Sequence, residues 1–422
     1  MSRNSQSRGT RSDTIWSGSF ITLSLSNFCN LFSQLMIITT LPLYSKALGA
    51  SATLIGFVAG SFAITAIIFG PLASPAFDSF PKKKIFASFI AFIGVLVISY
   101  SFVHSVIGLI VIRMLHGCAM GVTGPVALAL VSEILPQSKV GMGISVFSLG
   151  QALAEALGPA AAIFLIGAIG YPGTFRVCAC FMALGIILAF ATKEPAQSPR
   201  IPYRFSFSRI ISARSLPPAI VVFMLSAANA CIISLLAIYG SLLGIAGIGA
   251  YFTIAAGMLL ATRPIYGKLA ERVGYPKIVI MGLCFFICAL VVISMSTQLW
   301  HFLCAAVVSA CGYGACLPLI QAMCIQSETR DHSGTAGNTF FLLFNAAQFV
   351  GPFAAGAIVQ AFLGIGTSEA GAYSAMYLIL AGFVAISLIV FLLLKRKIMG
   401  NIEAARIADE AVNPLSEGDA NV

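Results

Sequence analysis

The chain repeats its own pattern of glycine, proline and charged residues at a fixed offset of 193 positions. At that distance Pro71 matches Pro264, and Gly121 matches Gly314. The other pairs at the same offset are Asp78 with Glu271, Lys84 with Lys277, Pro125 with Pro318, Gly141 with Gly334, and Gly158-Pro159 with Gly351-Pro352. One offset that holds over four separated segments predicts two halves built on one plan.

The composition places both halves in a membrane. The 422 residues are 59% hydrophobic and 9% charged, with a mean hydropathy of +0.97, whereas a soluble domain carries roughly 25% charged residues. Apolar runs of about 18–25 residues, each long enough to cross a bilayer as a helix, recur along nearly the whole chain. We count twelve, at 16–40, 53–76, 85–103, 106–131, 142–168, 174–192, 216–239, 248–268, 278–297, 301–325, 335–361 and 371–394. Because the runs are continuous rather than alternating, they exclude a β-barrel.

The sequence therefore predicts an all-α membrane protein with twelve transmembrane helices in two pseudo-symmetric six-helix bundles. Six spans are an even number, so the second bundle enters the membrane from the same side and the repeat is parallel. The longest break in the apolar pattern, with Pro195, Pro199 and Pro202, is interpreted as a linker. The expected parts are an N-terminal tail (1–15), two bundles (16–192 and 216–394) joined by that linker (193–215), and a C-terminal tail (395–422). Its polar, acidic part after Lys397 is expected to be disordered.

The net charge of +10 has a strongly uneven distribution. On the side of the expected termini lie Lys82–Lys84, the arginines of the linker and Lys395–Lys397, while the other side has little beyond Lys46. By the positive-inside rule, both termini and the linker are cytoplasmic, which predicts a multi-pass protein of the cell (inner) membrane. The basic charge is then topogenic and does not indicate nucleic-acid binding.

One loop motif resembles a known family. The segment Arg263–Gly274, RPIYGKLAERVG, resembles the cytoplasmic loop signature of the major facilitator superfamily, R-P-x-x-G-x-L-x-D/E-R-x-G. The matching first-half segment keeps Asp78 and its basic cluster but has Ser79 and Pro81 where the signature has arginine and glycine.

Two further segments resemble motifs of the same family. RMLHG, which begins at Arg113, resembles the family's intramembrane arginine motif. Gly158-Pro159 resembles the core of a motif found in proton-coupled exporters, although Ala154 and Ala161-Ala162 stand where glycines are usual. The resemblance covers residues 15 to 395, and it implies a secondary transporter of the drug- or sugar-efflux type.

Charged residues of the two loop motifs are expected to form a cytoplasmic gate. A carboxylate at a helix end can interact with the positive N-terminus of a neighbouring helix and with nearby cations. The expected gate residues are Asp78, Arg263, Glu271 and Arg272. The alternative is ordinary solvated loop charge.

Arg113 and Glu155 are the charged residues expected near the middle of the membrane. A charge there costs about 2.5–3.5 kcal/mol on insertion scales, so it needs a cavity or a partner. We expect the two to approach each other in the hairpin of spans four and five, with His116 on the same helical face as Arg113. Protonation and substrate binding would then compete at one coupling site, the alternative being a static ion pair.

Neutral polar residues are expected to line a central cavity. Asn27, Asn30 and Gln34 share one helical face because they are spaced three and four apart. The second half contributes Asn229, Tyr313, Gln321, Asn345 and Gln348. Such residues can instead hold helices together. The spacings Gly56-x-x-x-Gly60 and Gly117-x-x-x-Gly121 are expected to allow close helix approach.

The functional hypothesis is proton-coupled export of a small organic solute by alternating access. Uptake of a small organic anion or nutrient by proton symport is the alternative, and a non-transporting membrane sensor is a distant one. The sequence contains no Walker A loop and no H-E-x-x-H or G-x-S-x-G motif, so we expect neither ATP hydrolysis nor an enzyme. Eleven cysteines without metal-site spacing predict no metal, and we expect no cofactor. The expected partners are the solute, protons and lipid, and the protein is expected to be a monomer.

Overall fold

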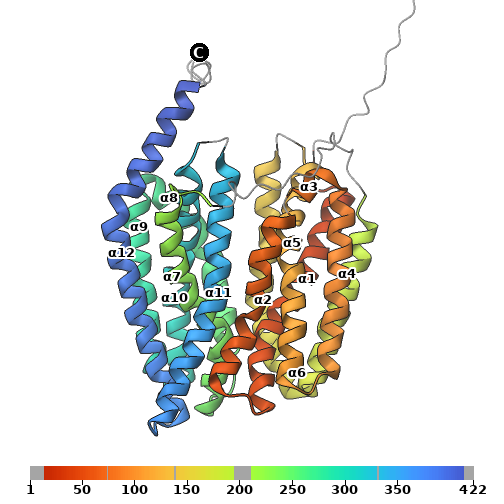
Figure 1. Ribbon diagram of the computed structural model, residues 1–422, viewed down its shortest axis with the longest axis vertical. Coiled ribbons are helices and arrows are strands. Elements are labelled where there is room, and N and C mark those ends of the chain that lie inside the picture. The colour runs from red at the N-terminus through yellow and green to blue at the C-terminus, as the bar shows by residue number, and fades with distance from the viewer. Residues whose placement is uncertain (1–13, 74, 137–138, 194–210, 330–331, 413–422) are drawn as a thin grey trace, which may run out of the picture.

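A computed structural model describes residues 14–73, 75–136, 139–193, 211–329 and 332–412, and helices dominate throughout these ranges, with no strand. The first half contains α1 (Gly18–Ala47), α2 (Ala52–Ala73), the short α3 (Ala76–Ser79), α4 (Lys82–Ser99), the 3-10 helix η1 (Tyr100–Phe102), α5 (Val106–Ile134) and α6 (Val140–Ala191). The second half contains α7 (Leu216–Leu242), α8 (Ala250–Val273), α9 (Tyr275–Ser294), α10 (Leu299–Gln326), α11 (Ser333–Gly364) and α12 (Glu369–Val412). The helices form two bundles that stand side by side (Figure 1).

Within the described ranges, ten helices are long and apolar enough to cross a membrane. One of them, α6, is 52 residues long and turns back at Gly170, whose φ of 70° and ψ of 178° are not helical. This backbone region is open essentially to glycine alone. The expected count of twelve is reached when α6 is divided at Gly170 and the shorter apolar segment of α8, Ala250–Thr262, is included.

Each half has its own hydrophobic core. Side chains from α1 to α6, such as Leu23, Ile90 and Met182, are fully buried against one another in the first half. Leu225 and Phe286 belong to the corresponding core of α7 to α12. The two cores agree with bundles that fold around separate interiors.

Glycines related by the 193-residue offset make equivalent contacts in the two halves. Gly121 of α5 lies against Ala66 and Gly70 of α2, and its counterpart Gly314 of α10 lies against Leu259 of α8. Gly158 of α6 lies against Leu35 and Phe32 of α1, while Gly351 of α11 lies against Ala227 of α7. Since α7 and α8 occupy the places of α1 and α2 in the second half, the sequence repeat is a structural repeat.

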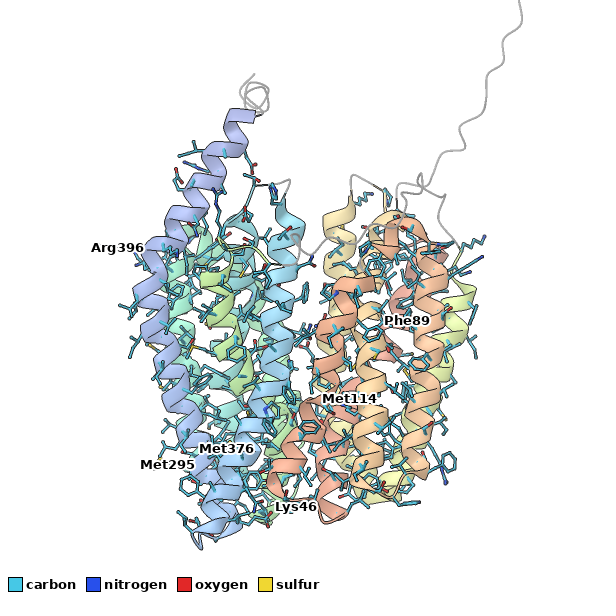
Figure 2. All side chains as sticks on the ribbon, viewed as in Figure 1. Lys46, Phe89, Met114, Met295, Met376 and Arg396 are labelled. Carbon is cyan, nitrogen blue, oxygen red and sulfur yellow. The ribbon has the colours of Figure 1, made fainter. Side chains whose placement is uncertain are left out.

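The two bundles define two ends of the molecule. The end at which α12 leaves the bundle, with Arg396 near it, is called here the terminal face; the other end, with Lys46 and Met295, is the opposite face (Figure 2). The ribbons of the two bundles converge at the opposite face and diverge toward the terminal face (Figure 1).

The chain beyond Lys397 differs from the expected disorder as far as it is described. Helix α12 continues to Val412, past the terminal face (Figure 1). Ile398 and Ala405 are buried, and the Asn401 side chain donates a hydrogen bond to the Arg214 carbonyl at 3.0 Å. The helix continues because one face of it packs on the end of the linker, a contact that the polar composition did not indicate.

Candidate functional site at the interface between the halves

Helices α2 and α11 join the two halves near the opposite face. Gly56 of α2 lies directly on the Pro352 carbonyl, and a Cβ atom at Gly60 would be 2.7 Å from Phe349 Cα. The Phe57 ring makes edge-on contacts with the stacked rings of Phe349 and Phe353, at centroid distances of 5.6 and 5.8 Å. The Gly56–Gly60 spacing therefore does allow close helix approach, and the helices it joins belong to different halves.

Polar contacts extend this closure at the opposite face. Lys46 Nζ at the end of α1 lies 2.6 Å from Glu369 Oε1 at the start of α12. The Ala52 amide, at the start of α2, donates a hydrogen bond to Gln360 Oε1 of α11 at 3.2 Å. Both contacts cross from one half to the other; of these four residues the sequence analysis named only Lys46, and not as part of a contact. A search for basic and acidic residues at the ends of spans one and twelve would have found the ion pair.

A second pair of helices, α6 and α8, joins the halves closer to their middle. The Thr253 hydroxyl donates to the Ala156 carbonyl at 3.4 Å, and a Cβ atom at Gly249 would be 3.2 Å from Ala160 Cα. Both contacts lie on the opposite-face side of Glu155. The described polar and glycine contacts between the halves thus gather in the part of the helices nearer the opposite face.

Glu155 is placed at this interface, near the middle of the first transmembrane part of α6. Its carboxylate accepts a hydrogen bond from Gln151 Nε2 at 3.0 Å, one helical turn away. It also lies within electrostatic range of Tyr313 on α10, in the other half. The Tyr313 hydroxyl is close to the side chains of Ser226 and Asn229 on α7. Three of the expected residues, Glu155, Tyr313 and Asn229, are therefore brought together from both halves.

Arg113 lies elsewhere, inside the first bundle. Its side chain is fully buried, and its guanidinium carbon is 4.3 Å from the centre of the Phe62 ring on α2. Tyr100 of η1 is within electrostatic range, but no guanidinium nitrogen has a partner in hydrogen-bond geometry among the described residues. His116 is also fully buried, and its Nδ1 lies 3.5 Å from the Tyr100 hydroxyl.

The expected approach of Arg113 to Glu155 is therefore wrong for this structure. Arg113 is seven residues from the opposite-face end of α5, whereas Glu155 is fifteen residues from the turn at Gly170. At about 1.5 Å of rise per residue, the two differ in depth by about 10 Å. They also face different ways, since Arg113 contacts α2 and Glu155 faces α10.

The polar stripe of α1 is buried rather than open to a cavity. Asn27, Asn30 and Gln34 are 6%, 1% and 5% exposed, and Gln34 Nε2 donates to Asn30 Oδ1 at 2.8 Å. Ser26 on the same helix donates to the Gly185 carbonyl of α6. The described hydrogen bond between α1 and α6 at this level therefore comes from Ser26, beside the stripe. Gln321, Asn345 and Gln348 in the second half are only partly buried.

The expected cytoplasmic gate lies mostly outside the described side chains. The side chains of Asp78, Arg263 and Glu271 lie outside the described part of the structure, and the Arg272 side chain is exposed. An ion pair that is described near the terminal face joins Lys82 Nζ to Glu133 Oε1 at 2.7 Å, within the first half.

Two repeated helical bundles with a polar site between them define a multi-pass membrane transporter. The model of the Major Facilitator Superfamily matches residues 23–352 and 219–417, so the chain belongs to that family. This confirms the resemblance inferred from the motifs.

Relatives and solved structures agree with this assignment. Multidrug resistance protein MdtG of Escherichia coli is 22% identical over 87% of this chain and 92% of its own length. Staphylopine export protein of Staphylococcus aureus is 25% identical over 61% of this chain and 68% of its own length. An uncharacterized MFS-type transporter of Methanocaldococcus jannaschii is 22% identical over 86% of this chain and 95% of its own length. A bacterial homolog of the human lysosomal transporter Spinster, inward-facing and occupied, has a TM-score of 0.74 at 16% identity, covering 90% of this chain and 97% of that one. The nucleoside transporter NupG has a TM-score of 0.71 at 13% identity, and the match covers 89% of this chain and 98% of NupG. These structures share the fold.

Proposed function

We propose that this chain is a secondary active exporter of a small organic solute, driven by proton antiport, with Glu155 as the coupling carboxylate. It acts as a monomer in a cell (inner) membrane, with the terminal face in the cytoplasm, where the positive-inside rule puts its basic residues. No resident cofactor takes part, because the ion gradient supplies the driving force.

The position of Glu155 is the observation that carries this proposal. A carboxylate within the membrane is costly unless it has a function or a partner. Glu155 is the acidic residue of α6, and it lies within electrostatic range of Tyr313 in the other half. A group in this place can exchange a proton for a solute while the halves rock about it.

The asymmetric contacts between the halves support alternating access. The opposite face is held by α2–α11 packing and by the Lys46–Glu369 pair, whereas the ribbons diverge toward the terminal face (Figure 1). With the terminal face in the cytoplasm, the described contacts close the outer side of the molecule, which supports loading of the solute from the inside. Rocking the halves would break the contacts at the opposite face and form others at the terminal face.

The direction of transport rests on the exporter-like Gly158-Pro159 motif and on the relatives. Two of the relatives are named for multidrug resistance and for staphylopine export. Uptake of an organic anion would be favoured by an arginine at the site between the halves, because a guanidinium binds a carboxylate through two hydrogen bonds. Arg113 is buried inside the first bundle and does not face the other half, so this structure gives that alternative no support.

Inverted membrane vesicles test the proposal whatever the chemical identity of the solute. Vesicles containing the wild type or Glu155→Gln are energised with an inward-acid pH gradient and incubated with a cell extract. Accumulated solutes are identified by mass spectrometry. We expect at least one solute to accumulate with the wild type, to be lost when the gradient is collapsed, and to be absent with Glu155→Gln.

The matched control is Glu133→Gln, the same chemical change in the same half but near the terminal face, where Glu133 pairs with Lys82. It should keep gradient-driven accumulation. Equal accumulation by wild type and Glu155→Gln would contradict the role of Glu155. Accumulation that ignores the pH gradient in both would contradict proton coupling.

A further inference from the structure

The first bundle encloses a polar cluster that the proposed transport cycle does not use. It consists of Arg113 and His116 on α5, Tyr100 on η1 and Phe62 on α2, and is called here the Arg113 cluster. The side chains of Arg113, His116 and Tyr100 are all fully buried, and Phe62 is 7% exposed. The cluster is therefore an interior feature of one half rather than part of the interface between the halves.

The sequence builds this cluster through one glycine. Gly117 lies directly on the Phe62 carbonyl, a contact that any side chain at position 117 would prevent. The close approach of α5 to α2 is extended by Thr65, whose hydroxyl donates to the Met114 carbonyl at 2.6 Å. As a consequence, the Phe62 ring lies over the guanidinium of Arg113 at 4.3 Å. The ring face offsets a part of the cost of burying the charge.

The cluster offers hydrogen-bond donors without matching acceptors. Arginine has five N–H donors and no acceptor. Its Nε, Nη1 and Nη2 are buried without a hydrogen-bond partner among the described residues, and so is His116 Nε2. When the Tyr100 hydroxyl donates to His116 Nδ1, across 3.5 Å, the imidazole carries its proton on Nε2. His116 then adds one more donor to the same interior.

Nearby carboxylates do not neutralise Arg113. Helices α2, α4 and η1 contain no acidic residue, and α5 contains only Glu133. Glu133 pairs with Lys82 at 2.7 Å, and Glu155 of α6 accepts from Gln151 and lies about 10 Å away in depth. A buried cation without a counter-charge is strongly unfavourable, so a bound anion would stabilise the cluster.

We propose that the Arg113 cluster binds a small monovalent inorganic anion of the chloride type, as a structural counter-ion inside the first bundle. A halide accepts hydrogen bonds and donates none, which matches the buried N–H groups of Arg113 and His116. A water molecule would not neutralise the charge of Arg113, and it would bring two donors of its own to an interior already rich in donors. The anion bonds to Arg113 and His116 of α5 and neutralises the charge that lies against Phe62 of α2 and near Tyr100 of η1. This inference does not depend on the proposed export function.

Thermal unfolding of the purified chain tests the anion site. The wild type is compared in sodium chloride and sodium gluconate at equal ionic strength, with the chloride fraction varied. A ligand that binds only the folded state raises the midpoint with the logarithm of its concentration above Kd. We expect that rise for the wild type and its loss in Arg113→Met, which keeps a long side chain but removes the charge and all donors. The control Arg176→Met removes an exposed arginine of the same half and should keep the rise.

A second variant and a direct measurement keep the inference falsifiable if Arg113→Met does not fold. His116→Leu leaves the cation but removes one donor, so we expect chloride to act only at higher concentrations. A crystal grown in bromide should give an anomalous peak between Arg113 and His116. Equal wild-type midpoints in chloride and gluconate, the same chloride dependence in His116→Leu as in the wild type, or an anomalous map without that peak would overturn the inference. Each of these readouts is independent of transport.

Discussion

Lys46 and Glu369 form an ion pair of 2.6 Å between the end of α1 and the start of α12, 323 positions apart in the sequence. The pair joins the two halves at the opposite face, beside the hydrogen bond from the Ala52 amide to Gln360. Its side chains are 30% and 41% exposed, so water screens the interaction. The pair can therefore form and break during a transport cycle at modest cost.

Removing this pair should loosen the opposite face. A partly exposed ion pair contributes at most about 1 kcal/mol, so we expect Lys46→Ala to shift the ratio of the two conformations by up to about fivefold. Hydrogen–deuterium exchange of residues 47–55 and 365–370 should become faster. The charge exchange Lys46→Glu with Glu369→Lys should restore slow exchange. The Lys82–Glu133 pair lies within one half, so Lys82→Ala is the control and should leave the exchange of these segments unchanged.

Enlarging Gly56 should prevent closure of the opposite face altogether. Gly56 lies on the Pro352 carbonyl, and backbone cannot move aside as a flexible side chain can. We expect Gly56→Leu to fold, because each half keeps its own core, but to stay open at the opposite face and to lose solute accumulation. Gly382→Leu in α12 introduces the same residue where nothing lies within 4 Å, and it should transport normally. Normal transport by Gly56→Leu would refute the alternating contact of α2 and α11.

The Tyr313 hydroxyl should matter for transport because it faces Glu155 from the other half. Loss of a polar group beside a charge typically costs about 1.5–3 kcal/mol, so we expect Tyr313→Phe to lower gradient-driven accumulation by about tenfold to a hundredfold. Combined with Glu155→Gln it should add nothing, since both act at one site. Tyr373→Phe makes the same change at a buried tyrosine within the core of the second half and should have little effect. Additive losses in the double variant would show that Tyr313 acts elsewhere.

Gly170 should be needed for the turn that divides α6. Its φ of 70° and ψ of 178° are strained for any residue with a Cβ atom, at a cost of about 1–3 kcal/mol. We therefore expect Gly170→Ala to lower the thermal unfolding midpoint. Gly167→Ala, three residues earlier in regular helix and with nothing within 4 Å, should leave it unchanged. Equal midpoints for both variants would mean that the turn adapts to a side chain.

The sequence predicted the repeated helical architecture well, because the cause of that architecture is local. Long apolar runs specify membrane helices, and the 193-residue offset specifies that α7 and α8 repeat α1 and α2. The equivalent contacts of Gly121 and Gly314 follow from this repeat. The turn at Gly170 also falls between two expected spans. The helical continuation of α12 was missed because it depends on packing of Ile398 and Ala405.

The candidate site was predicted less completely, because helix rotation and depth are set by tertiary packing. Glu155 was expected at a coupling site, and Tyr313 and Asn229 at a central cavity; in the structure Glu155 lies within electrostatic range of Tyr313. Arg113 was expected beside Glu155, but the close α2–α5 approach at Gly117 turns it toward Phe62. The buried stripe of α1 and the Lys46–Glu369 pair likewise depend on which helices become neighbours. Spacing along one helix does not contain that information.

Distances between spin labels at both faces test the central claim, that the two halves rock about the site at Glu155. One label pair at Leu54 and Ile365 spans the opposite face, and another at Phe80 and Lys277 spans the terminal face; all four positions are exposed. When the pH is varied, we expect one distance to lengthen as the other shortens in the wild type, and both to become insensitive to pH in Glu155→Gln. Distances that stay fixed at both faces, or that change with pH as strongly in Glu155→Gln as in the wild type, would contradict the account.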